Sequence, residues 1–114
     1  ATFAPKLRKE DGRVDWSKSA EAVDRHVRAM TPWPSAFTFL GKERIIIVRG
    51  GPAGPGDPAG PRGTVLSVDR DGLAISCGGG SAYRIARIKI EGRREAEAAA
   101  FARSGKISPG NLLA

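Results

Sequence analysis

Apolar residues in the first third of the chain recur at helical spacing. Val23, Val27 and Met30 follow one another at intervals of four and three residues, which predicts an amphipathic helix with one buried stripe. Ser17 or Ser19 can cap the start of this helix by accepting a backbone N–H bond. The sequence therefore predicts one clear helix before any strand.

Beyond this helix the apolar residues alternate, or run together, in the manner of β-strands. In the last such segment the apolar positions change parity between Ile85 and Ile88, so we expect a β-bulge near Ala86 and Arg87. The predicted strands cover residues 37–39, 44–48, 65–68, 73–77 and 83–90.

Glycine and proline mark the connections between these segments. Residues 50–63, GGPAGPGDPAGPRG, are predicted to form a long, weakly ordered loop, and residues 78–80 a turn. A short helix is expected to close the chain, with Glu95 and Glu97 at its positive N-terminal end and Gly105 as its C-cap. The predicted fold is mainly β with helices, a small open β-barrel (OB-like) with an N-terminal helix and a short C-terminal helix.

The net charge of the chain indicates what kind of partner the domain would bind. The 114 residues carry a net charge of +7 and a pI near 10.3, which favours a polyanionic partner, with nucleic acid as the first hypothesis. The alternative is a surface charge that serves solubility. No apolar run approaches the roughly 20 residues of a membrane helix, so no membrane partner is expected.

The residue types of catalytic and metal centres are scarce. Cys77 is the single cysteine and His26 the single histidine, so neither an internal disulfide nor a convincing zinc cluster or Cys–His nucleophile pair can be assembled. His26 flanks the apolar helix stripe and is interpreted as a partly buried structural residue. A lone cysteine fits a reducing, cytoplasmic location.

Basic residues gather in two parts of the sequence. Residues 1–12 have no clear periodicity, contain Lys6, Arg8 and Lys9, and are interpreted as a basic linker from an upstream unit, which leaves residues 13–114 as the folded domain. The second group is Arg84, Arg87, Lys89, Arg93 and Arg94. The predicted bulge would place the first three of these residues on one solvent face of the last strand.

Several strings resemble the C-terminal domain of methionyl-tRNA formyltransferases. They are ATFAPK at 1–6, DWS at 15–17, VRAMTPWP at 27–34, GTVL at 63–66, GRR at 92–94 and PGNL at 109–112. The chain departs from the family at Ser35, where glycine is usual, and at Gly79, where an acidic residue is common. These departures, with the Gly/Pro stretch, affect local turn geometry alone.

The resemblance implies architectural roles for Trp16 and for the string Pro32-Trp33-Pro34. The two prolines would stop the helix and fix the exit angle of the chain, and Trp33 would pack against the barrel. Stacking of Trp33 on a nucleic-acid base is the alternative interpretation.

The resemblance also implies a reaction, which is transfer of a formyl group from 10-formyltetrahydrofolate to the amino group of methionine on initiator tRNA. The catalytic Asn, His and Asp and the folate-binding loop would belong to a Rossmann-like N-terminal domain outside this chain. We therefore assign no catalytic residue, cofactor or metal here and expect the fragment alone to be inactive. The expected partners are initiator methionyl-tRNA and that N-terminal domain of the same polypeptide, in a cytoplasmic monomer.

On this resemblance the domain would hold the tRNA body, which makes the catalytic encounter effectively intramolecular. Lys6, foremost, with Arg8 and Lys9 would lie at the seam between domains, and the second basic group would face phosphates; ordinary solvated charge is the alternative for both. Two other functions stay open: a related formyltransferase acting on nucleotide-linked amino sugars, and a free-standing OB-like RNA-binding module. The basic balance and the Ala-Pro-Lys string favour tRNA.

Overall fold

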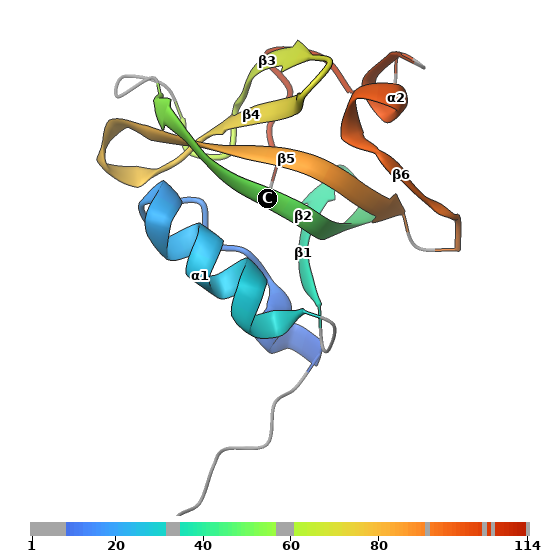
Figure 1. Ribbon diagram of the computed structural model, residues 1–114, viewed down its shortest axis with the longest axis horizontal. Coiled ribbons are helices and arrows are strands. Elements are labelled where there is room, and N and C mark those ends of the chain that lie inside the picture. The colour runs from blue at the N-terminus through green and yellow to red at the C-terminus, as the bar shows by residue number, and fades with distance from the viewer. Residues whose placement is uncertain are drawn as a thin grey trace, which may run out of the picture.

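The computed structural model describes residues 9–31, 35–56, 61–90, 92–103, 105 and 107–113. A 3-10 turn, η1 (Lys9–Gly12), precedes helix α1 (Ala20–Met30), and helix α2 (Ala98–Arg103) follows the last strand (Figure 1). The predictions for Lys6, Arg8, the side chain of Lys9 and the Pro-Trp-Pro string lie outside the described residues. No described helix is long and apolar enough to span a membrane.

Six antiparallel strands form one sheet in the order β1-β2-β5-β4-β3, with β6 also paired to β5. The predicted mainly β architecture, with one helix before the strands and one after them in the sequence, is confirmed. The sheet is open, because no pairing joins β1 to β3 in the described part of the chain. The strands are β1 (Ala36–Leu40), β2 (Glu43–Pro55), β3 (Val65–Asp69), β4 (Gly72–Ser76), β5 (Ser81–Ile90) and β6 (Glu95–Glu97).

Helix α1 follows the predicted pattern. Of the two candidate caps, Ser19 is the one used, since its hydroxyl accepts a hydrogen bond from the Ala22 N–H. Val23 and Val27 are buried, so the apolar stripe faces the sheet. The helix ends where Thr31 turns extended, as expected for a residue that precedes a proline.

One hydrophobic core joins both helices to the inner face of the sheet. Val23 of α1, Ile47 of β2 and Phe101 of α2 all belong to it, although the two helices lie on opposite sides of the β2–β5 pair (Figure 1). Trp16, before α1, is 4% exposed, and its indole N–H donates to Thr38 Oγ1 at 3.0 Å. The core thus reaches from the segment before α1 to Leu113.

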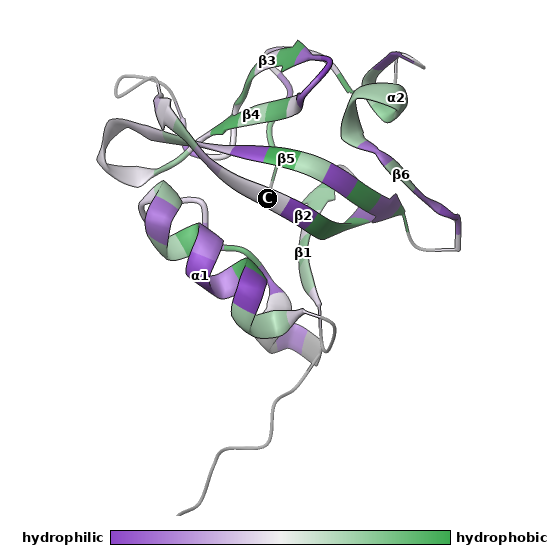
Figure 2. Ribbon diagram, viewed as in Figure 1, coloured by the Kyte–Doolittle hydropathy of each residue, from purple (hydrophilic) through white to green (hydrophobic). Residues whose placement is uncertain are grey.

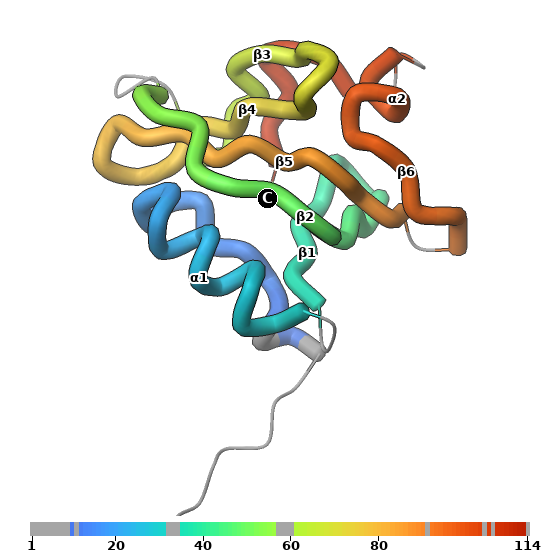
Figure 3. The backbone as a smooth tube through the Cα atoms, viewed as in Figure 1, coloured from blue at the N-terminus to red at the C-terminus, as the bar shows by residue number. Residues whose placement is uncertain are grey.

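The predicted bulge in β5 is confirmed, and β2 carries a matching one. The register between the strands shifts at two adjacent positions and leaves Val48 and Ala86 without a Cα partner. The inward positions accordingly move from Ile85 to Ile88. Figure 2 shows hydrophilic and hydrophobic residues alternating along β5, and Figure 3 shows the two strands running side by side through this region.

The prediction of a loop throughout residues 50–63 is wrong, because its first part, up to Pro55, continues β2. This part pairs with β5 from the Gly50–Ile85 pair to the Pro55–Ser81 pair. Glycine and proline have low strand propensity, yet a ten-residue neighbour already fixed in the sheet offers a ladder that overrides the local preference. The backbone stays regular enough to pair despite an additional shift at Ala53.

The prediction that Glu95 and Glu97 begin the last helix is also wrong. They form β6, and α2 starts at Ala98. Strand β4 pairs with β5 only as far as Ile85, which leaves the edge from Arg87 to Lys89 available, and β6 occupies it. The predicted C-cap is retained, since Gly105 has φ 83° and its N–H donates to the Ala102 carbonyl.

Two turn positions show the effect of the departures from the family pattern. Ser35, where the resemblance implied a departure from glycine, has φ 78°, a left-handed conformation that costs a side-chain-bearing residue roughly 1–2 kcal/mol. Residues 78–80 form the predicted turn, a 3-10 segment η2 (Gly78–Gly80) in which Gly79 has φ 71°. Glycine at 79 therefore suits its backbone, whereas serine at 35 is strained.

Candidate functional site

Outward-facing side chains of β2 and β5 bring three arginines together at the paired bulges. Arg49 lies directly opposite Arg87, and the next outward pair is Gly51 with Arg84. We call Arg49, Arg84 and Arg87 the arginine cluster. Arg49 and Arg84 line a depression of about 300 Å³, together with Gly50 and Gly51.

Acidic residues offset two members of the arginine cluster. Arg87 Nε donates to Glu95 Oε2 of β6 at 2.7 Å, and Arg84 lies 3.8 Å from Asp69 of β3. Arg49 has no ionic partner within 4 Å among the described residues. Like charges directly opposite each other destabilise a sheet. Glu95 already offsets the charge of Arg87, so Arg49 is the member of the cluster whose charge a bound anion would offset.

The structure divides the predicted basic stripe into two parts. Arg84, Arg87 and Lys89 alternate with the buried Ile85 and Ile88 and therefore share the outward face of β5. By contrast, two of the predicted residues line a separate cavity of about 280 Å³ together with core-facing side chains of β5 and α2. Those two residues are Arg93 and Arg94.

Sequence reasoning missed Arg49, the third member of the cluster. It follows the apolar run of β2 and precedes the Gly/Pro stretch, which was predicted to be a loop. Strict alternation after the inward-facing Ile45 and Ile47 would turn residue 49 toward the core. An arginine at this position therefore signals a bulge in β2 at Val48, which returns the side chain to the outward face.

A second basic surface covers the aromatic residues of β1. The guanidinium carbon of Arg44 lies 4.0 Å from the Phe37 ring centroid, and that of Arg13 lies 5.2 Å from the Phe39 centroid. Phe37 is buried outside the main core. A free-standing single-strand binder would be expected to expose such rings, but among the described residues Leu112 is the one large apolar side chain that is mostly exposed.

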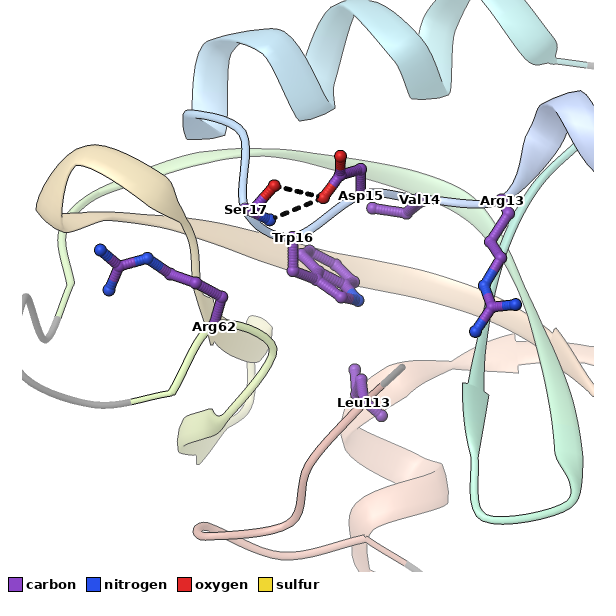
Figure 4. Close-up of a pocket in the computed structure, with 7 residues that line it drawn as sticks. All are labelled: Arg13, Val14, Asp15, Trp16, Ser17, Arg62 and Leu113. Atoms are coloured by element: carbon purple, nitrogen blue, oxygen red, sulfur yellow. Dashed lines mark hydrogen bonds between the residues drawn. The ribbon is translucent and has the colours of Figure 1, made fainter.

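A groove of about 460 Å³ lies beside the buried Trp16, with Arg13 and Arg62 on opposite sides of the indole (Figure 4). The hydroxyl and the backbone N–H of Ser17 both donate to Asp15 Oδ1 and lower the pKa of that carboxyl. Asp15 is therefore a carboxylate at neutral pH and places a negative charge in the groove. This arrangement supports a structural role for Trp16 and assembles no acid–base pair.

Catalytic and metal chemistry find little support in the described part of the chain. It holds no group of three or more His, Cys, Asp and Glu residues able to bind a metal. His26 Nε2 lies 3.1 Å from the Gly12 carbonyl oxygen, which ties α1 to η1, as expected of a structural histidine. Cys77 is fully buried.

Burial of Cys77 predicts a pH dependence of stability. Desolvation raises the pKa of the thiol from 9.0 to about 11. The unfolded chain loses this proton first, so the free energy of unfolding should fall as the pH rises from about 9 to about 11, by about 2 kcal/mol. Chemical denaturation at pH 8 and pH 10.5 measures the fall.

The matched variant is Cys77→Ala, which should reduce this dependence. Burial also raises the pKa of Tyr83, so a further decline above pH 10 is expected in both proteins. An identical pH profile in the two proteins would show that the thiol is not the responsible group.

The fold and the site define a small antiparallel β domain with basic outward surfaces and no catalytic constellation among its described residues. Residues 6–106 match the family described as formyl transferase, C-terminal domain. The chain belongs to this family.

Three similar curated proteins share one name. The methionyl-tRNA formyltransferases of Geotalea uraniireducens and Citrifermentans bemidjiense are 43% and 42% identical to this chain over 97% of its length. That of Gluconacetobacter diazotrophicus is 44% identical over 99% of the chain. The chain spans about a third of the length of each, 34%, 34% and 35% respectively.

Proposed function

We propose that this chain is the C-terminal, tRNA-holding domain of a methionyl-tRNA formyltransferase. The complete enzyme would transfer a formyl group from 10-formyltetrahydrofolate to the methionyl amino group of initiator tRNA. The observation that carries the holding role is the arginine cluster on the outward face of β2 and β5. Nearly complete coverage of this chain by relatives of that name supports the choice of enzyme.

The described residues do not fit a formyl-transfer centre, so catalysis is assigned to the rest of the polypeptide. Asn111 is the one asparagine of the sequence, and its Oδ1 accepts a hydrogen bond from the Ser108 N–H in the tail. His26 is engaged by Gly12. Folate binding and chemistry would therefore belong to a Rossmann-like N-terminal domain, and this domain contributes positioning.

The proposal includes an OB-like arrangement of the open sheet. The bulges in β2 and β5 curve the sheet. Isolated bridges extend both edges, Arg13 with Phe37 at β1 and Thr64 with Leu112 next to β3. Such curvature supports a partly open barrel whose outer strand faces meet the nucleic acid.

The proposed setting is a cytoplasmic monomer whose partners are initiator methionyl-tRNA and the N-terminal domain. An amino-sugar formyltransferase is less well supported, because the relatives described above are named for methionyl-tRNA. A free-standing RNA-binding module is also disfavoured, since these relatives are about three times as long as this chain.

A salt titration of binding to initiator tRNA tests the holding role. If about five phosphate contacts form, affinity should fall several hundred-fold between 50 and 200 mM salt, because each contact releases counterions. An elongator tRNA should bind similarly, since phosphate contacts carry no base information. Neutral substitutions of Lys6 and Arg8 should make the slope shallower if the linker contributes.

Failure to bind either tRNA at 50 mM salt would contradict the holding role. The domain would then be a scaffold for its catalytic neighbour, or the substrate would not be RNA. Binding that is independent of salt would equally contradict a phosphate-based interface.

A further inference from the structure

We propose that the depression at the paired bulges binds one phosphate group of the RNA backbone between Arg49 and Arg84 and the bare strand at Gly50 and Gly51. This inference rests on the proposed function and assigns it a defined site. It adds Arg49 to the residues indicated by the sequence. The ligand class is a phosphodiester, whose chemistry a free phosphate ion shares.

The first argument is the distribution of charge. Arg49 and Arg87 are cross-strand partners, Arg84 lies one outward pair away, and the two nearby acids reach only Arg84 and Arg87. Arg49 therefore lies opposite Arg87 and diagonal to Arg84, and has no ionic partner within 4 Å among the described residues. A phosphate there would pair with Arg49 and reduce the repulsion from its neighbours.

The second argument is the incomplete engagement of Arg84. Its contact with Asp69 is long, 3.8 Å, and its buried Nε has no hydrogen-bond partner in the described structure. An unmade hydrogen bond at a buried donor is costly. The guanidinium is thus held at the edge of the depression without its donors being fully used by the protein.

The third argument concerns the two glycines in the depression. Packing explains Gly50, because a Cβ there would lie 2.5 Å from the Tyr83 hydroxyl oxygen. Packing does not explain Gly51, where a Cβ would meet nothing within 4 Å and the backbone needs no positive φ. As the partner of Arg84, Gly51 presents bare backbone on the same outward face, which leaves room for a close approach by the ligand.

Two substitutions test the site with different physics. Arg49→Gln removes a charge, and Gly51→Leu fills the depression without changing charge. Each should lower affinity for initiator tRNA about eightfold at 100 mM salt and reduce the slope of log K against log salt by about one, the contribution of one phosphate contact. The double variant should lose little more than either single variant, because both remove the same contact.

Arg103→Gln is the matched control, since it removes one exposed charge from α2. It should bind as the unchanged chain does, and thermal unfolding should show all variants folded. Equal losses from Arg49→Gln and Arg103→Gln, or full affinity in Gly51→Leu, would overturn the phosphate site. If the unchanged chain still binds tRNA in that case, the proposed function survives; if it binds no tRNA at all, the proposed function itself fails.

A second readout needs no RNA. Inorganic phosphate added at constant ionic strength should shift the NMR amide signals of Gly50 and Gly51, and Arg49→Gln should abolish these shifts. Equal shifts with chloride, or shifts spread evenly over the domain, would show that the depression does not select phosphate. Saturation by phosphate with no competition against tRNA would assign the site to a free anion and overturn the RNA contact.

Discussion

Truncation of Trp16 to alanine is expected to lower the free energy of unfolding by about 3–5 kcal/mol, the usual cost of removing a buried tryptophan side chain. The indole is 4% exposed and belongs to the main core. Its ring centroid lies 6.3 Å from that of Tyr83, and its N–H donates to buried Thr38. Urea denaturation of the 114-residue chain, followed by circular dichroism, measures the change.

Two further variants separate the packing of Trp16 from its hydrogen bond. Trp16→Phe retains much of the apolar volume and loses the donor, so it should cost less than the alanine variant. Thr38→Val removes the acceptor and leaves the buried indole N–H unsatisfied, which costs about 1–3 kcal/mol. A Trp16→Ala protein within 1 kcal/mol of the unchanged chain would contradict a core role for this residue.

The second large effect is expected at Gly50. Substitution with alanine should destabilise the domain by about 3 kcal/mol, the upper end of the usual cost of overpacking. The new Cβ would lie 2.3 Å from the Arg84 carbonyl oxygen and 2.5 Å from the Tyr83 hydroxyl oxygen. Neither group can move freely, because one is backbone of the central strand β5 and the other is completely buried.

Gly51→Ala is the control for this prediction, one residue along the same strand. Its Cβ would enter open space, so the free energy of unfolding should change by no more than about 0.5 kcal/mol. Chemical denaturation of both variants under identical conditions gives the comparison. Equal destabilisation would mean that strand propensity, rather than contact with Tyr83, requires glycine at position 50.

Local signals were enough to predict α1 and most strands. The spacing of Val23 and Val27, the Ser19 cap and the parity change in β5 depend on neighbouring residues, and the structure shows all of them. The end of β2 and the whole of β6 were not predictable in this way. Neither GGPAGP nor Glu-Ala-Glu has strand propensity, and both are ordered by the long neighbouring strand.

The candidate site was predicted only in part for a related reason. Arg84, Arg87 and Lys89 share a face because of one bulge that their own sequence reveals. Arg49 joins them through a second bulge in another strand, which is a property of the pairing and not of either segment. The Pro32-Trp33-Pro34 string marked the family, and its architectural role stays a prediction because it lies outside the described residues.

The long strand β2 also bears on whether molecules of this protein aggregate at high concentration. Strand β1 pairs with it only up to Ile47, whereas β5 pairs with it as far as Pro55. In the described part of the chain, the second half of β2 therefore has one edge without a strand, a potential template for aggregation. Pro52 and Pro55 lack an N–H, and the bulge at Ala53 breaks the regular ladder. The glycine and proline residues that made this segment resemble a loop in the sequence thus also hinder its edge from pairing with the sheet of another molecule.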